Sequence, residues 1–423
     1  MMKSLNIGFY IPELDGHENT GSFTFLNNLV QSLSAQDQQT KNNIFVICEN
    51  IKLVSDLKGK NLKVLPLPAL IVKANPSYLN IWRFRIGSWV KKIFNFFYLS
   101  MEFSSDSVKF SNRYYSTSEK PYRLEELIDN HEIDLMIYAN QFEIPTMCRP
   151  YIWILWDLGC KTINFFHQIE QSHAIQEKLT NNASNAFRII SGSKEGALEI
   201  SKYLNFPSER IRTISFPVPS DLLSCKSICP NQELKPYLFY PALLTPFKNH
   251  AVILEALKLL HDWKQPLHFV MSGVNKDNLE HILHLAKELG IENFVHYLGT
   301  VSLEELKGLY QNAEAMVFPS LLGPNNFPPI EAMALGVPCI ASNIKGHLDQ
   351  LEDNALFFDP LYPKSLADKV DKLINDSTLR RKLIKKGNDF TNNLTPIKYV
   401  EELLECAEEF LPYKKNWSKF RNF

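Results

Sequence analysis

The feature that most constrains the fold is a regular alternation of short apolar runs and amphipathic helical stretches in the second half of the chain. After Lys235 the apolar runs are YLFYPAL, LHFVMSG, FVHYLG, AMVFPS, PCIAS and ALFFD. Runs of this kind between helical segments are typical of buried parallel strands, because each parallel strand needs a crossover helix before the next one. A spacing of roughly 20 to 30 residues per unit predicts a Rossmann-like, doubly wound domain.

The first half of the chain shows the same pattern with longer interruptions. Its strand-like runs are LNIGFYIP, IFVIC, LKVLPL, DLMIYAN, YIWILWDL, FRIISGS and RTISFP. Residues 217–236 contain four prolines and show neither a helical nor a strand period, which is typical of an interdomain linker. We therefore predict an α/β protein with two Rossmann-like, doubly wound domains that face a cleft. The N-terminal domain spans 1–216, the C-terminal domain spans 237–395, and 396–423 form a helical tail that packs back across the domains.

Composition narrows the class of protein further. The 423 residues include 45 basic and 46 acidic side chains, which give a formal net charge of −1. A chain this close to neutrality has no general attraction for nucleic acid, so no nucleic-acid partner is expected. The seven cysteines are an odd number without a CxxC pair, a usage that favours a reduced, cytoplasmic compartment. The N-terminal apolar run is too short for a signal-peptide core, and we interpret it as the first strand.

The stretch GPNNFPPIEAMALGVPCIAS, residues 323–342, predicts a short helix between a polar loop and a strand. Asn325 and Asn326 are good N-cap residues, and the two prolines that follow suit a first helical turn. Gly336 suits a left-handed C-cap. The free N–H groups and the dipole at the start of this helix favour a bound anion. Glu331 then has two interpretations: a structural first-turn carboxylate, or an acceptor for the two ribose hydroxyls of a nucleotide.

Other loops are expected at the same edge of the two sheets. Ligands of doubly wound sheets bind beyond the carboxyl ends of the strands. In the second half, LLTPFKNH carries Lys248 and LGTVS carries Gly299. We interpret Lys248 as a diphosphate ligand at the start of a helix, with a solvated lysine as the alternative. In the first half, LDGHENTGSFTFLNNLV joins a strand to its helix, and Gly21 and Ser22 predict a close-approach turn that faces the same cleft.

These segments resemble a known family. VHYLGTVSLEELKGLYQNAEAMVFPSLLGPNNFPPIEAMALGVPCIASNIKG is similar to the nucleotide-sugar-binding domain of GT-B glycosyltransferases, in particular the retaining family-four enzymes of glycosyltransferase group 1. The resemblance extends over about 236–390, and YIWILWDLG resembles the strand that leads to the acceptor side. It implies transfer of a sugar from a nucleoside diphosphate sugar with retained anomeric configuration. It also implies that Lys248 holds the diphosphate, that Glu331 holds the ribose, and that the backbone of Asn325, Asn326 and Phe327 contacts the donor sugar.

The chain departs from the family pattern at three positions. The family has two glutamates eight positions apart, and the partner of Glu331 is replaced by Gly323. The arginine that usually precedes the lysine is missing near Ala242, and a histidine at the end of the acceptor-side strand is replaced by Trp156. A subset of the family has a similar Gly-Pro-x-Asn loop, so these departures do not imply a loss of activity.

The predicted mechanism needs a fixed cation and amide groups around the leaving diphosphate, where negative charge develops. Lys248 and the 323–331 loop supply them. Asp157 is the candidate for acid–base help because it ends a buried strand at the cleft, and a structural aspartate is the alternative. No Asp-x-Asp motif is present, so neither a metal nor another cofactor is predicted. His281 and His284 are interpreted as part of a solvated helix face.

The segment WRFRIGSWVKKIFNFFYL, residues 82–99, predicts an amphipathic helix with aromatic residues on one face and four cations on the other. Such a helix binds an anionic membrane surface, and the alternative is a helix packed on its own sheet. Membrane binding would suit a peripheral position on the inner face of the cell membrane and a lipid-linked acceptor.

We therefore expect a retaining hexosyltransferase that acts on a glycan or lipid-linked acceptor, in the assembly of a cell-surface polysaccharide. Two other hypotheses remain open. One is nucleotide-sugar epimerisation on a related fold. The other is a non-catalytic nucleotide-sugar-binding subunit, which the replacement at Gly323 keeps open.

Overall fold

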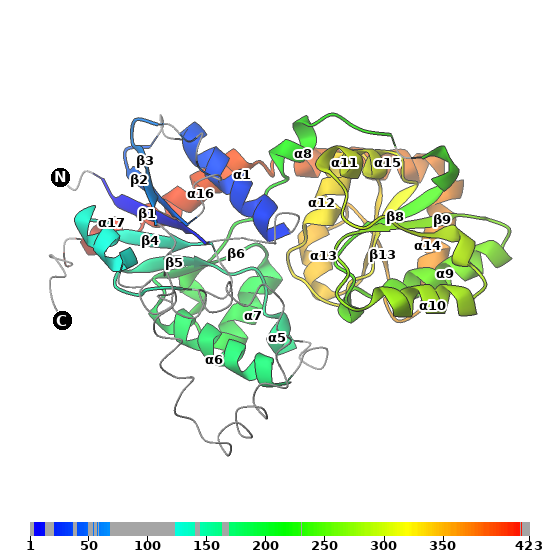
Figure 1. Ribbon diagram of the computed structural model, residues 1–423, viewed down its shortest axis with the longest axis horizontal. Helices are drawn as coiled ribbons and strands as arrows, with labels where there is room; N and C mark the ends of the chain where they lie inside the picture. The colour runs from blue at the N-terminus through cyan, green and yellow to red at the C-terminus, as the bar shows by residue number, and fades with distance from the viewer. Residues whose placement is uncertain are drawn as a thin grey trace, which may run out of the picture.

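The structure is a computed structural model that describes residues 4–12, 21–36, 40–49, 54, 57, 59–67, 123–139, 144–162, 169–229, 231–414 and 416. These residues form two parallel sheets of seven and six strands, each covered by helices (Figure 1). Every pairing between neighbouring strands is parallel. The prediction of two doubly wound α/β domains is confirmed.

The N-terminal sheet has the strand order β3-β2-β1-β4-β5-β6-β7. Its strands are β1 (Asn6–Ile11), β2 (Asn43–Cys48), β3 (Leu62–Pro66), β4 (Leu135–Tyr138), β5 (Tyr151–Ile154), β6 (Arg188–Ser191) and β7 (Ile211–Thr213). One face packs against α1 (Gly21–Gln36) and the other against α6 (Ile169–Asn185) and α7 (Lys194–Leu204). The short helix α5 (Gly159–Thr162) follows β5 at the carboxyl edge of the sheet.

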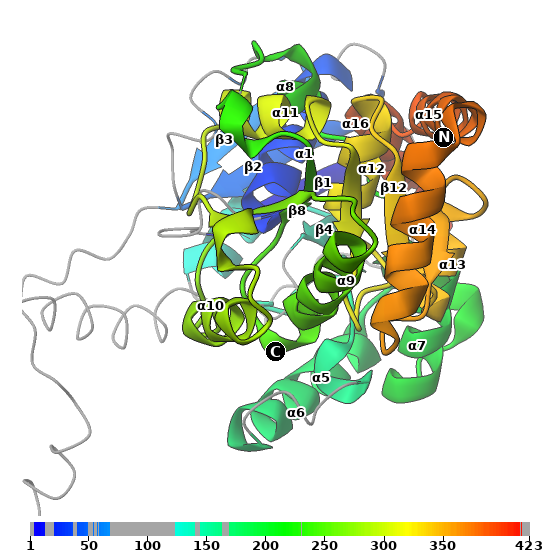
Figure 2. The same cartoon turned by 90° about the vertical axis from the view of Figure 1, so that its right-hand side faces the viewer.

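The C-terminal sheet has the strand order β10-β9-β8-β11-β12-β13. Its strands are β8 (Tyr237–Pro241), β9 (His268–Ser272), β10 (Val295–Tyr297), β11 (Ala315–Phe318), β12 (Cys339–Ser342) and β13 (Leu356–Phe358). Its helices are α9 (His250–Asp262), α10 (Leu279–Glu288), α11 (Leu303–Gln311), α12 (Phe327–Ala334), α13 (Lys345–Leu351), α14 (Pro363–Asn375) and α15 (Ser377–Thr391). Figure 2 shows α9 and α10 on one side of the strands, with α11 and α12 on the other.

The strands are apolar along their whole length because both faces of each sheet are covered. In β5, the side chains of Ile152 and Ile154 enter the core beneath α1, while Tyr151 and Trp153 enter the core on the opposite face. All four residues are buried. Such strands give the continuous apolar runs from which they were predicted.

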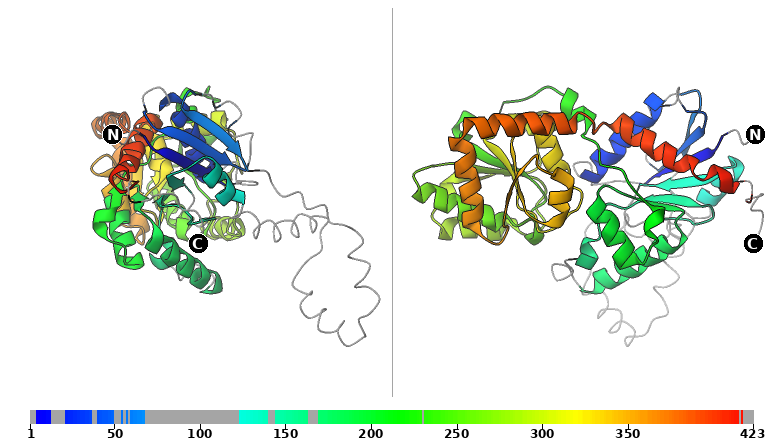
Figure 3. Two further views of the ribbon diagram at one scale, coloured as in Figure 1. Left: turned by 90° about the vertical axis from the view of Figure 1, so that its left-hand side faces the viewer. Right: turned by 180° about the vertical axis from the view of Figure 1, so that it is seen from behind.

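The two domains are joined twice. The first connection, residues 217–236, contains the short helix α8 (Ser220–Ser224) and the 3₁₀ turn η5 (Gln232–Leu234). Both elements are too short to produce the helical period that the sequence of this segment lacks. The second connection is α16 (Pro396–Glu408), which leaves the C-terminal domain and packs on α1, so that its apolar residues join the N-terminal core (Figure 3). The last helix, α17 (Leu411–Lys414), also lies on the N-terminal domain.

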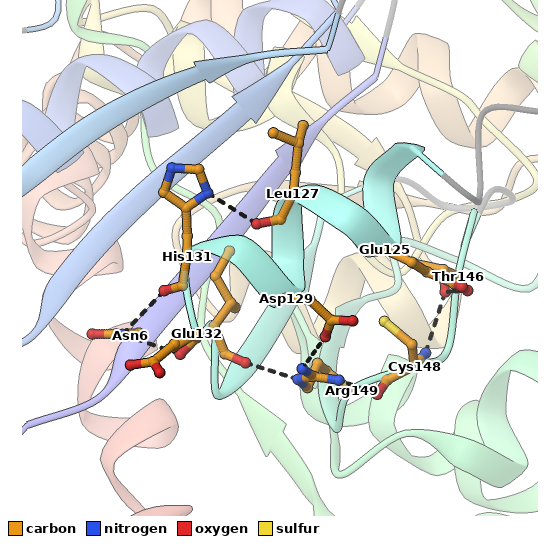
Figure 4. A network of polar contacts seen from close by, with 10 residues as sticks. Asn6, Glu125, Leu127, Asp129, His131, Glu132, Thr146, Cys148 and Arg149 are labelled. Carbon is orange, nitrogen blue, oxygen red and sulfur yellow. Dashed lines mark hydrogen bonds and ion pairs between the residues drawn. The ribbon is translucent and has the colours of Figure 1, made fainter. Parts of the chain in front are cut away.

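A polar network connects the amino-terminal ends of strands in the N-terminal sheet (Figure 4). Arg149, which precedes β5, donates to the Ile133 carbonyl at 2.9 Å and pairs with Asp129 in a helical segment at 123–130. The amide of Asn6, the first residue of β1, donates to the carbonyls of His131 and Glu132. These bonds hold β1, β4 and β5 in register. The register of the strands in turn sets the positions of the loops at their carboxyl ends.

None of the helices in the described part of the chain is long and apolar enough to cross a membrane. The predicted amphipathic segment, 82–99, lies outside the described residues.

Candidate active site

The C-terminal sheet has its switch point between β8 and β11. Successive strands move from β8 to β9 in one direction and from β11 to β12 in the other. The loops that follow β8 and β11 therefore diverge to opposite faces and leave a crevice at the carboxyl edge, where ligands of such sheets bind. Lys248 follows β8 and α12 follows β11, so the crevice has a cation on one side and a helix N-terminus on the other.

Lys248 ends the 3₁₀ turn η6 (Pro246–Lys248), and α9 begins two residues later. The expectation that it starts a helix was therefore wrong. Its ammonium lies 5.4 Å and 5.3 Å from the ring centres of Phe247 and Phe318. Asn249 adopts a left-handed conformation, and its amide donates to the Pro360 carbonyl at 2.9 Å. The loop is thus tied to the segment after β13 and holds the ammonium at the crevice.

The Lys248 ammonium is poorly solvated. Burial lowers its pKa to about 8, and the Asp157 carboxylate of the N-terminal domain acts in the opposite direction. Burial, together with the charge of Lys248, lowers the pKa of His250 and of His347 to about 3. Both histidines are therefore neutral at pH 7. A partly desolvated cation of this kind interacts strongly with a bound anion.

Glu331 is the fifth residue of α12, because the helix begins at Phe327 and the two prolines occupy its second and third positions. The prediction of a first-turn position was wrong. Its side chain is 8% exposed, and one carboxylate oxygen accepts a hydrogen bond of 2.8 Å from the Tyr310 hydroxyl of α11. Burial raises the pKa of Glu331 to about 7, which the Tyr310 bond partly offsets, and Asp221 of α8 raises it further.

Gly323 has a φ of +122°, a conformation that side chains rarely adopt. A Cβ atom at this position would lie 2.6 Å from the amide oxygen of Asn326. The Asn326 amide nitrogen donates to the Gly323 carbonyl at 2.7 Å, and Gln350 of α13 holds the Asn326 backbone. The carboxamide of Asn326 therefore occupies the space that a side chain at 323 would enter.

The loop before α12 contacts the N-terminal domain directly. The amide nitrogen of Asn325 donates to the Trp156 carbonyl at 2.7 Å, and its amide oxygen is buried without a hydrogen-bond partner among the described residues. Asp157 follows Trp156, and its carboxylate accepts a bond of 2.8 Å from the Gly159 amide at the start of α5. The loop after β5 and the loop before α12 therefore meet at one place.

An aromatic cluster packs beside this junction between the two domains. Phe327 stacks on Phe216 with ring centres 5.5 Å apart, and Phe25 of α1 lies 6.3 Å from Phe327. Gly21 and Ser22 are the first two residues of α1, so Phe25 brings the start of that helix near the start of α12. The Phe327 ring therefore packs in this junction.

Gly299 lies in the loop after β10, with a φ of +68° and open space where a side chain would be. Its carbonyl accepts a hydrogen bond from Gly273, which ties this loop to the one after β9. His281 and His284 are exposed on α10, as predicted, and His284 faces Glu288 one turn away. Within the described ranges, no group of three or more His, Cys, Asp or Glu side chains is arranged to hold a metal ion.

Sequence reasoning missed the partners that set the electrostatics of the site. Tyr310 belongs to the apolar face of α11, and its fully buried hydroxyl needs a hydrogen-bond partner. A tyrosine on an apolar helix face therefore indicates that a polar partner is buried nearby, although nothing in the sequence selects Glu331 as that partner. His347 and Asp221 likewise reach the crevice only through the topology.

Two parallel α/β domains that contact each other and a C-terminal helix that returns to the first domain are the features of the GT-B class of fold. Residues 228–390 match the family model described as "Glycosyl transferases group 1". This part of the chain, most of the C-terminal domain, is therefore similar to this family of glycosyltransferases.

Similar proteins agree with this assignment. O-antigen chain mannosyltransferase B of Escherichia coli is 24% identical over 262 residues, which are 60% of this chain and 69% of that protein. O-antigen chain mannosyltransferase RfbU of Salmonella typhimurium is 30% identical over 175 residues, 41% of this chain and 47% of that protein. The match to RfbU therefore spans about half of that relative. The solved structure of HepE from Anabaena, described as a complex with UDP-glucose, superimposes with a TM-score of 0.65 at 14% identity and covers 96% of this chain and 100% of HepE.

Proposed function

We propose that this protein transfers a hexose from a nucleoside diphosphate sugar to a glycan or lipid-linked acceptor, with retained anomeric configuration, in the assembly of a cell-surface polysaccharide. The observation that carries the proposal is the placement of Lys248 after β8 and of Glu331 after β11, on the two sides of the switch point of the C-terminal sheet. The O-antigen names of the relatives and the UDP-glucose in HepE support the acceptor and donor classes.

The geometry suits this chemistry step by step. The diphosphate lies against the Lys248 ammonium, and the ribose hydroxyls donate to the free oxygen of Glu331. The backbone of the loop from Gly323 to Phe327 faces the donor sugar. As the bond from the anomeric carbon to the phosphate oxygen breaks, charge develops on the diphosphate, and Lys248 stabilises it there. The oxygen of the acceptor hydroxyl bonds to the anomeric carbon, and its proton passes to the Asp157 carboxylate.

The test is release of nucleoside diphosphate from a panel of nucleotide sugars, including GDP-mannose and UDP-glucose, with and without octyl glycoside acceptors. Release that depends on acceptor, with a product whose anomeric proton coupling in NMR matches that of the donor, is expected. Conversion of the donor to its epimer would support the epimerase alternative. Nucleotide binding without any turnover would support a binding subunit.

Restoring a carboxylate at position 323 is expected to damage the site. Gly323→Glu places a Cβ atom 2.6 Å from the Asn326 amide at a φ of +122°, a strain of roughly 1 to 3 kcal/mol. We expect a lower melting temperature and weaker donor binding, measured by thermal unfolding and calorimetry. Gly290→Glu is the matched control, because Gly290 also has a positive φ but has open space around it. Full donor affinity in Gly323→Glu would show that the loop accepts the family carboxylate.

Membrane binding through 82–99 is proposed as the way this protein reaches a lipid-linked acceptor. Replacing Trp89 and Phe97 with serine is expected to abolish sedimentation with anionic vesicles at low salt, while the melting temperature changes little. High ionic strength should release the wild-type protein, because it screens the cations of the segment. Loss of stability in the double variant, without vesicle binding by the wild type, would assign the segment to the N-terminal core.

A further inference from the structure

Helix α7 of the N-terminal domain presents one face to the C-terminal domain. The backbone N–H of Glu195 donates to the Asp349 carboxylate of α13 at 2.9 Å. A Cβ atom at Gly196 would lie 3.5 Å from Pro324, in the loop before α12. Glu199 follows Glu195 by four residues and Gly196 by three. It therefore lies on the same face of the helix, one turn further along.

Glu199 is a carboxylate without a matching donor. Its Oε2 atom is buried and has no hydrogen-bond partner in the described part of the chain. Burial raises the pKa of Glu199 to about 7, and Asp157 and Glu195 raise it further, while Lys202 acts in the opposite direction. A buried oxygen left unpaired costs free energy, and such groups persist where a ligand supplies the missing donor.

The neighbours of Glu199 indicate what that donor is. Asp157 is close enough to influence it and contributes a second carboxylate from the end of β5. The amide oxygen of Asn325, in the loop before α12, is also buried and has no hydrogen-bond partner within the ranges that the structure describes. All three groups offer acceptor oxygens. Hydroxyl groups donate to such oxygens, whereas a phosphate or a carboxylate ligand brings negative charge and only further acceptors.

We propose that Glu199 binds hydroxyl groups of the acceptor sugar beside Asp157 and thereby selects a neutral sugar over a phosphorylated one. This inference rests on the proposed transfer reaction and adds the chemical class of its acceptor. Lys248 faces the same space from the donor side, so the two substrates meet groups of opposite charge. The acceptor hydroxyls lie between the carboxylates of the N-terminal domain and the diphosphate site.

The pH dependence of thermal stability distinguishes a ligand-binding role of Glu199 from a structural role. Glu199 has a folded-state pKa near 7, above its value in the unfolded chain, so its contribution to folding is lost as pH rises from about 4.5 through 7. Glu199→Gln removes the charge and keeps the shape. It is therefore expected to raise the melting temperature at pH 8 and to change it little at pH 4. A structural carboxylate that is paired in the folded state would give a lower melting temperature at pH 8.

The binding test uses saturation-transfer NMR with octyl α-mannoside and octyl α-mannoside 6-phosphate, in the presence of the nucleoside diphosphate that the protein binds. We expect the wild type to bind the neutral glycoside at least tenfold more tightly than its phosphate. Glu199→Gln should lose about tenfold in affinity for the neutral glycoside and keep its nucleotide affinity. Glu209→Gln, at an exposed position just after α7, is the matched control and should bind like the wild type.

Equal affinity of Glu199→Gln and Glu209→Gln for the neutral glycoside would overturn the inference, as would tighter binding of the phosphate by the wild type. Nucleotide binding by a wild type that binds neither glycoside would also overturn it and leave the donor site intact. Failure of the wild type to bind any nucleoside diphosphate would instead contradict the proposed function itself.

Discussion

Replacement of Lys248 by alanine is expected to lower kcat by about 100- to 1,000-fold, the usual effect of removing one group that stabilises developing charge. The ammonium is held between the rings of Phe247 and Phe318 and is poorly solvated. Its interaction with the diphosphate therefore strengthens as negative charge builds during bond cleavage. Because the gain comes in the transition state, donor affinity should fall much less than turnover. Steady-state kinetics and calorimetry with the same donor measure the two effects.

Lys258→Ala is the matched control, because Lys258 is an exposed lysine on α9 that pairs with Asp262 one turn away. It should retain wild-type kinetics. Equal losses of turnover and donor affinity in Lys248→Ala would assign Lys248 to ground-state binding alone. Unchanged turnover would remove Lys248 from the site.

The pH dependence adds a second test of the same residue. The diphosphate favours protonated Lys248, whose pKa in the free protein is about 8, so kcat/KM should fall as pH rises above about 8. Lys248→Arg retains the charge to much higher pH. That variant should therefore lose the alkaline fall, whatever its absolute rate.

The elements of both sheets were predictable because their strands are covered on both faces. Tyr237–Pro241 and Ala315–Phe318 each appear in the sequence as an uninterrupted apolar run between helical segments. The helix Ser220–Ser224 was missed because five residues are too few to show a helical period. Glu331 was placed one residue too early in the helix, because the sequence does not show whether the first proline or the preceding phenylalanine begins the helix.

The positions of the proposed site residues after strand ends were also predictable, but their contacts were not. Lys248, Asp157 and Glu331 follow strands at the carboxyl edge, and the alternation of strands and helices indicates such positions. The hydrogen bond from Tyr310 to Glu331 joins helices on one face of the sheet. The bond from Asn325 to Trp156 joins residues 169 positions apart in different domains. Such contacts depend on how the domains are placed, and no local pattern encodes them.

Glu331→Gln is expected to weaken donor binding by about 10- to 150-fold, which corresponds to the roughly 1.5 to 3 kcal/mol of a hydrogen bond to a charged group. The carboxylate has one oxygen bound to Tyr310, and its other oxygen is proposed to accept from the ribose. Ribose hydroxyls bind best to the ionised form, whereas burial holds the pKa of Glu331 near 7 in the free protein. Wild-type donor affinity should therefore rise as pH increases from 6 to 8, and calorimetry should show no such rise in Glu331→Gln.

Tyr310→Phe tests the assignment without touching the carboxylate. The Tyr310 hydrogen bond lowers the pKa of Glu331, so its removal should raise that pKa and move the rise in donor affinity to higher pH. Glu292→Gln, an exposed carboxylate before β10, should bind donor like the wild type at every pH. A wild-type affinity that stays constant from pH 6 to 8, in a protein where Glu331→Gln folds and binds normally, would show that Glu331 is a structural partner of Tyr310 and not a ribose ligand.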